Sequence, residues 1–117
     1  MQLALYGNEI LVYRNPVDFR KSLTGLTALV ISQLKKNPQD GIYIFYNRHQ
    51  DKVKCLSWHK NGFVLIYKRI EKGKFDFKFD QNDGVLSITL EEFGWLLAGL
   101  PYNKMRDWKD LDYSKFS

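Results

Sequence analysis

Basic side chains are concentrated in the middle of this chain, where they alternate with aromatic and apolar ones. Residues 48–78 hold nine basic and three acidic residues, a net charge of +6, whereas the whole chain of 117 residues carries +5. This asymmetry raises the electrostatic potential over one part of the surface and favours polyanions, of which nucleic acid is the commonest inside a cell. The basic residues of the stretch are Arg48, Lys52, Lys54, Lys60, Lys68, Arg69, Lys72, Lys74 and Lys78.

The spacing of these side chains indicates which of them share a surface. Because side chains alternate between the two faces of a strand, a strand over residues 52–58 places Lys52, Lys54 and Trp58 on one face. Proteins that bind single-stranded nucleic acid use cations to follow the phosphates and exposed aromatic rings to stack on the bases. We therefore hypothesise a nucleic-acid-binding surface that includes Arg48, Lys52, Lys54, Trp58, Lys68, Arg69, Lys72 and Lys74.

The same residues also have a purely structural interpretation. Trp58, Phe63 and Tyr67 can form part of the buried core, because large aromatic side chains are mostly buried. The lysines then form a solvated edge that discourages pairing with another strand. We favour the core for the aromatic rings, and for the lysines the sequence leaves both interpretations open.

Arg20 and Lys21 form a second group of cations, close behind Asp18. The predicted helix begins at Asp18, so both cations fall on its first turn, where a helix N-terminus and two cations could hold a backbone phosphate. Alternatively, Asp18 caps the helix and Arg20 pairs with a nearby carboxylate. Cations at the start of a helix interact unfavourably with the helix dipole, so their presence there needs an explanation. The sequence therefore leaves both the phosphate clamp and the structural interpretation open.

Three residues invite a catalytic or metal-binding interpretation, namely His49, His59 and Cys55. Both histidines fall in polar turns, which would not hold a nucleophile rigidly. Two histidines and one cysteine cannot supply an ordinary four-ligand zinc site, and a single cysteine cannot form an internal disulfide. Cys55 lies among apolar residues and is expected to act as a small hydrophobic side chain. The sequence therefore predicts no metal and no cofactor.

The carboxylates do not suggest an enzyme either. A two-metal nuclease needs several carboxylates that converge on one point, whereas the acidic residues here are spread over predicted turns and helix caps. Glycine-rich phosphate loops are also absent from the sequence. We therefore expect a binding function and name no catalytic residue.

The elements that must position the cations follow from periodicity. Residues 9–14 have the composition of a strand, which Asn15 and Pro16 end. From Asp18 the apolar residues recur at spacings of three and four, which predicts a helix with Asp18 as its N-cap. Asn37 and Pro38 end this helix.

The second half of the chain predicts a meander of strands. Residues 42–47, 52–58 and 62–70 are rich in aromatic and β-branched residues, and short polar links of hairpin type separate them. Residues 74–79 alternate Phe75, Phe77 and Phe79 with charged residues, which predicts another strand with all three rings on one face. A short strand over 85–89 completes the set.

A second helix is predicted over residues 89–100. Thr89 and Glu92 have the spacing of a capping box, and Gly99 with Pro101 supplies the end of the helix. The tail over residues 101–117 has no clear period and is expected to be loosely held.

Together these elements predict an α+β fold in one domain over residues 1–117, in the order β-α-β-β-β-β-β-α. The sheet has five to six strands and is mainly antiparallel, with the helices on one side or at one end. No apolar run reaches the roughly 18 residues that a membrane span requires. The N-terminus also lacks the pattern of a signal peptide. We therefore expect a cytoplasmic protein without a membrane partner.

Three stretches of the chain, over residues 17–30, 40–75 and 84–100, together resemble a known family. In this order and spacing they are similar to the accessory TnpB protein, the product of the second open reading frame in bacterial insertion sequences of the sixty-six group. The resemblance implies a short protein that is encoded beside a separate transposase and supports efficient transposition. Nothing transfers from the RNA-guided nuclease of the same name, which is several times longer and carries a carboxylate active site. The tail after Leu100 departs from the family pattern.

Two functions follow from this resemblance and from the charge pattern. In the first, the protein binds DNA of the element, or transposase bound to that DNA, through the basic residues. In the second, it is an adapter that contacts the transposase or a host factor without touching nucleic acid, through Trp95, Trp108 and the tail. Both make DNA or the transposase the expected partner.

Overall fold

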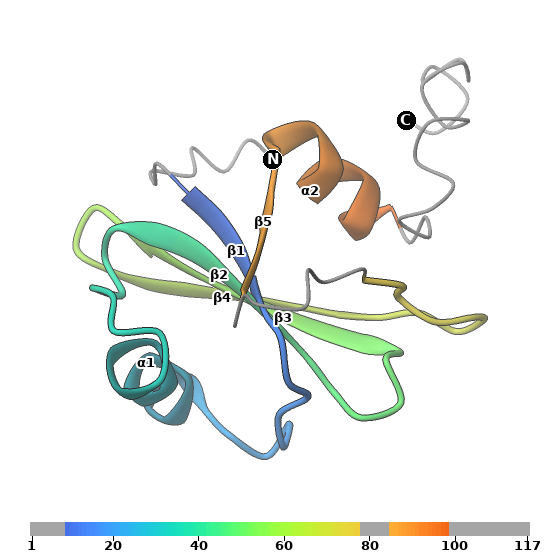
Figure 1. The fold of residues 1–117 in the computed structure, drawn as a ribbon, viewed down its shortest axis with the longest axis horizontal. Helices are drawn as coiled ribbons and strands as arrows, with labels where there is room; N and C mark the ends of the chain where they lie inside the picture. The colour runs from blue at the N-terminus through green and yellow to red at the C-terminus, as the bar shows by residue number, and fades with distance from the viewer. Residues whose placement is uncertain (1–8, 78–84, 99–117) are drawn as a thin grey trace.

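The computed structural model describes residues 9–77 and 85–98, which form one five-stranded sheet with two helices (Figure 1). The strand order across the sheet is β4-β3-β2-β1-β5. All neighbouring strands are antiparallel except β1 and β2, which are parallel and are connected through α1. The predicted α+β fold with a mainly antiparallel sheet is confirmed. The elements are β1 (Glu9–Tyr13), α1 (Leu23–Ser32), β2 (Gly41–Tyr46), β3 (Lys52–His59), β4 (Gly62–Arg69), β5 (Val85–Ile88) and α2 (Leu90–Leu97).

The two helices cover opposite faces of the sheet, so the prediction that they lie on one side or at one end was wrong. In Figure 1, α1 lies below the sheet and α2 above it. On the α1 face, Leu26 and Val30 are buried against a cluster that includes Phe45. On the other face, Phe93 and Leu96 of α2 join a separate cluster. The sheet is therefore the middle of three layers.

The central strand β2 explains this arrangement. All six residues of its sequence GIYIFY are buried, including the aromatic ones. A strand with one solvated face alternates apolar and polar residues, whereas a strand covered on both faces is a continuous apolar run. Tyr43 and Phe45 point towards α1, and Ile42 and Ile44 point towards α2.

The first helix begins later than predicted, at Leu23, with Ser22 as the N-cap residue. The Asp18 carboxylate does not cap it. Instead, Asp18 Oδ1 accepts a hydrogen bond from the backbone N–H of Arg20 at 2.9 Å, and the Asp18 carbonyl accepts one from the N–H of Lys21 at 3.0 Å. Aspartate competes for backbone N–H groups in this way and favours a turn over a helix. Arg20 and Lys21 therefore precede the helix and do not lie on its first turn.

The sixth strand predicted over residues 74–79 is also wrong for residues 74–77, which belong to no strand, and residues 78 and 79 lie outside the described ranges. Phe75 donates its backbone N–H to the Gln50 carbonyl at 2.6 Å, which ties the segment to the turn between β2 and β3. Phe75 is buried on the α2 face, and the Phe77 ring stacks on Tyr46 at 5.2 Å. Phe75 and Phe77 thus share one core, as predicted, without a strand.

The second helix begins as predicted. Thr89 Oγ1 accepts a hydrogen bond from the N–H of Glu92 at 3.1 Å, and Glu92 Oε1 accepts one from the N–H of Thr89 at 2.9 Å, which is a complete capping box. The predicted stop at Gly99 and Pro101 and the tail over 101–117 lie outside the described residues, so the one-domain boundary stays a prediction. Neither described helix has the length and apolar character that a membrane crossing requires.

We expect Thr89→Ala to lower the free energy of unfolding by about 1 kcal/mol, because it leaves an N–H at the start of α2 without its acceptor. Thr89→Ser retains a hydroxyl and is the matched control. Chemical denaturation of both variants measures the difference. Equal stability of Thr89→Ala and the parent would mean that the capping box contributes nothing.

Candidate nucleic-acid interface

The segment between β1 and α1, residues 14–22, is attached to one end of the sheet. The backbone N–H of Val17 donates to the Tyr46 carbonyl at 2.9 Å, and the Tyr46 hydroxyl donates to the carbonyl of Arg14. Val17 also packs against the cluster on the α1 face. This segment, which we call the approach loop, therefore lies beside the end of β2 and the turn that follows it (Figure 1).

The side chain of Lys54, on β3, bonds the approach loop to the part of the sheet formed by β3 and β4. Its Nζ donates to the carbonyl of Phe19 at 2.9 Å and to that of Lys21 at 3.0 Å. The same ammonium lies 4.9 Å from the centre of the Phe19 ring, within the range of a cation–π interaction. One half-buried cation thus satisfies two loop carbonyls, and the predicted phosphate ligand Lys54 has a structural role.

Strand register adds further cations on the same face. Lys52 and Lys54 lie on the α1 face of β3 because they alternate in phase with Leu56, which is buried there. Arg69 is the cross-strand partner of Lys52. Arg48 follows β2 in the adjacent turn, and it lines a hollow together with Val17 and Asp18 of the approach loop.

Six cations from the approach loop, the turn after β2 and strands β3 and β4 therefore gather at one end of the sheet. We call this surface the basic corner and define it by Arg20, Lys21, Arg48, Lys52, Lys54 and Arg69.

Three carboxylates lie close to these cations and reduce the charge of the corner to a net +3. Asp18 pairs with Arg20 at 2.6 Å, and Glu71 pairs with Arg69 at 3.0 Å. Asp51 accepts a hydrogen bond from the side-chain amide of Asn47 at 2.6 Å, inside the turn after β2. The structural alternative that the sequence left open is thus half correct: Arg20 pairs with a nearby carboxylate, but this carboxylate is that of Asp18, which does not cap the helix.

The Asp18–Arg20 pair is exposed, so it shapes the approach loop more than it stabilises the fold. The side-chain hydrogen bonds from Arg20, followed by the backbone N–H of Arg20, lower the pKa of Asp18 from its ordinary 3.8 to about 2. The same pair raises the pKa of Arg20. Both shifts indicate that the pair stays ionised at neutral pH.

Two of the predicted site residues lie away from the basic corner. Lys68 is on the α2 face, where its ammonium donates to the carbonyl of Leu97 at the end of α2 and compensates the negative end of that helix. Trp58 shares the face of Lys54, but it is four residues further along β3, roughly 13 Å at the usual rise per residue. It is half-buried and packs edge-on against Phe63 at 4.9 Å. Neither residue joins the other candidates.

Lys72 and Lys74 are exposed and lie on the segment that follows β4. This segment is attached to the β2–β3 turn through the Phe75–Gln50 hydrogen bond, and through a bond from the Ile70 N–H to the Asp51 carbonyl at 2.8 Å. Both lysines are therefore at the same end of the sheet as the basic corner, without a hydrogen bond or ion pair to it among the described residues.

Of the residues considered for catalysis, His49 and Cys55 occupy the positions that the sequence predicted, whereas His59, predicted in a turn, belongs to strand β3 and pairs with Gly62 of β4. His49 is exposed in the turn after β2, and His59 ends β3. Cys55 is fully buried, and burial raises the pKa of its thiol to about 12, so the unreactive thiol form prevails. Across residues 9–77 and 85–98, no three His, Cys, Asp or Glu side chains are grouped so that they could hold a metal ion.

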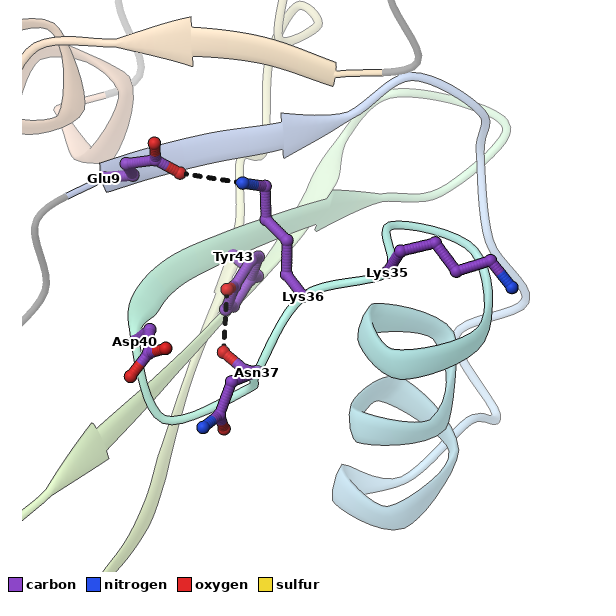
Figure 2. Close-up of a pocket in the computed structure, with 6 residues that line it drawn as sticks. All are labelled: Glu9, Lys35, Lys36, Asn37, Asp40 and Tyr43. Carbon is purple, nitrogen blue, oxygen red and sulfur yellow. Dashed lines mark hydrogen bonds and ion pairs between the residues drawn. The ribbon is translucent and has the colours of Figure 1, made fainter.

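A separate hollow of about 420 Å³ lies at the opposite end of β2. Figure 2 shows Lys36 reaching across it to Glu9, at 3.2 Å, while the Lys35 side chain points away. The Tyr43 hydroxyl donates to the Asn37 carbonyl at 2.9 Å. Four of its six lining residues are thus bonded in pairs, and two of the six, Glu9 and Asp40, are carboxylates, which makes the hollow a weaker candidate for an anionic ligand than the basic corner.

The fold and the basic corner define a small three-layer α+β protein with a cationic surface at one end of its sheet. Residues 8–107 match a family model described as IS66 Orf2 like protein. The chain belongs to this family, which gives it an accessory role in an insertion sequence. The resemblance inferred from the three sequence stretches is therefore confirmed.

Two proteins of Sinorhizobium fredii (strain NBRC 101917 / NGR234) are similar to this chain. It is 40% identical to the uncharacterized protein y4jC over 101 residues, which cover 86% of each chain. It is 28% identical to the uncharacterized protein y4hO over 86 residues, which cover 73% of this chain and 74% of that one. No solved structure matches the chain.

The approach loop should respond to acid at an unusually low pH. A carboxylate whose pKa is depressed in the folded state stabilises that state above the unfolded value and loses this effect as the pH falls through the folded value. For Asp18 the window lies between pH 3.8 and about 2. We expect an NMR titration of the Asp18 carboxyl carbon to have its midpoint at about 2, and Arg20→Gln to move it towards 3.8.

Lys21→Gln is the matched control, because Lys21 makes the smallest contribution to the lowered pKa of Asp18 and its removal should barely change the midpoint. A midpoint near 3.8 in the parent protein would show that the Asp18–Arg20 pair does not form in solution.

Proposed function

We propose that this protein assists transposition and DNA recombination of its insertion sequence by holding the element's DNA, or transposase-bound DNA, on the basic corner. The proposal is supported by one observation above all: the approach loop, the turn after β2 and the paired strands β3 and β4 bring six cations to one end of the sheet. The family gives the accessory role in an insertion sequence. The partner is then DNA, and the place of action is the bacterial cytoplasm.

The state of each cation sets the expected strength of binding. Arg20 and Arg69 are ion-paired, and Lys54 is bonded to backbone carbonyls. The other three corner cations, Lys21, Arg48 and Lys52, have no ion pair within the described residues and are the main phosphate ligands of the proposal. Three neutralised phosphates on duplex DNA correspond to a slope of about −3 in a plot of log affinity against log salt concentration.

The adapter hypothesis is the alternative to DNA binding, and the experiment must distinguish the two. One of the contacts that the sequence suggested for it, Trp95, is only 6% exposed and packs inside the protein. Trp108 and the tail lie outside the described residues. Leu90 is the exposed large apolar residue of α2, and a single exposed apolar side chain does not make a docking surface.

The test is the charge reversal of two exposed corner cations, Lys21→Glu with Arg48→Glu, measured by fluorescence anisotropy with labelled DNA over a series of salt concentrations. We expect a loss of about tenfold or more in affinity at low salt, and a salt slope that is shallower by up to about 2, because two phosphate contacts are removed. Lys54 is left unchanged because its loss would also release the approach loop.

The matched control is Lys35→Glu with Lys60→Glu. These residues are also exposed, and the two variants have the same net charge, but Lys35 follows α1 and Lys60 follows β3, at the far end of the sheet. Equal loss of affinity in both variants would mean that DNA binding depends on the net charge of the protein and not on the basic corner. Absence of DNA binding by the parent at low salt, with retained binding to the transposase, would establish the adapter instead.

A further inference from the structure

Tyr67 is an exposed aromatic side chain within the basic corner. It lies on β4 directly opposite Lys54, and the residue is 51% exposed. Its ring is 6.2 Å from that of Phe19, at 59°. The other exposed large apolar residues of the described chain, Ile31 and Leu90, are on the helices and are not part of the corner. Tyr67 is therefore the described residue that combines an exposed ring with cationic neighbours.

The neighbours of Tyr67 hold its ring in place. The Phe19 ring packs against it from the approach loop, and the ammonium of Lys54 lies over the Phe19 ring in a cation–π contact. Arg69 lies two residues further along the same face of β4, opposite Lys52. An exposed ring that is supported on one side and flanked by cations provides the two elements that unpaired strands require: stacking for a base and positive charge for the phosphates.

We infer that the basic corner takes single-stranded DNA, with an unpaired base stacked on Tyr67 and the adjacent phosphates on the cations beside it. The inference rests on the proposed function and specifies its ligand. In a duplex each base is already stacked between its neighbours, and exposing one to a protein ring requires unstacking. Tyr67 therefore contributes to the binding of an unpaired strand and not to the binding of an intact duplex.

The experiment compares the parent with Tyr67→Leu, which keeps an apolar side chain on β4 but removes the aromatic ring. Anisotropy is measured with a single-stranded DNA of about 12 nucleotides, with its duplex and with RNA of the same sequence. We expect Tyr67→Leu to bind the single-stranded DNA roughly 5- to 100-fold more weakly, with an unchanged salt slope because no charge is lost. Duplex affinity should change by less than about twofold.

Two control variants keep the result interpretable. Tyr67→Trp retains a stacking ring and should bind the single strand at least as well as the parent. Ile31→Leu changes a comparably exposed side chain away from the corner and should have no effect. If Tyr67→Leu does not fold, Tyr67→Thr replaces it as the variant without a ring. We then expect folded Tyr67→Thr to bind the single strand more weakly than Tyr67→Trp.

The outcomes separate this inference from the proposed function. Duplex binding by the parent at least as tight as single-strand binding, with no effect of Tyr67→Leu, overturns the inference and leaves the proposed function standing. Tighter binding of the RNA than of the DNA overturns the assignment to DNA. Absence of binding to any nucleic acid at low salt overturns both.

Discussion

The contact between the Lys54 ammonium and the carbonyls of Phe19 and Lys21 is the constraint on which the basic corner depends. Without it, the approach loop would keep its backbone bond to β2 but lose its attachment to β3, and Phe19 would lose the cation above its ring. Hydrogen bonds from a charged donor are stronger than neutral ones, by roughly a factor of two. One lysine thus joins a loop to a strand more than thirty residues away and brings their cations together.

Local signals in the sequence predicted most of the elements. The strand over 9–14 and the capping box at Thr89 were correct, because each depends on residues that are close in sequence. The start of the first helix was wrong because the Asp18 carboxylate and carbonyl accept hydrogen bonds in a tight turn instead of capping a helix. The sixth strand was wrong because the phenylalanine alternation serves packing on the α2 face and not pairing with a neighbouring strand. The continuous apolar run of β2 was the available signal that both faces of the sheet are covered.

Strand periodicity allowed only one part of the candidate site to be predicted, namely which residues share a face of the sheet. Alternation correctly placed Lys52 and Lys54 on one face, and the observed register adds Arg69 to that face. Periodicity could not show that Lys54 bonds to the approach loop or that Lys68 bonds to α2, because both partners are brought near by the tertiary fold. For the same reason the exposed ring is Tyr67 and not Trp58, which Phe63 partly covers.

The most direct test of the account is the mapping of DNA binding onto the protein by amide chemical shifts. A short single-stranded oligonucleotide is titrated into the isotope-labelled full chain. If the basic corner binds the strand, the shifted amides will cluster in the approach loop, in the turn at residues 47–51 and at the Tyr67–Arg69 end of β4. Shifts centred on α2, or on the hollow beside Lys36, would contradict the assignment of the basic corner as the DNA-binding surface.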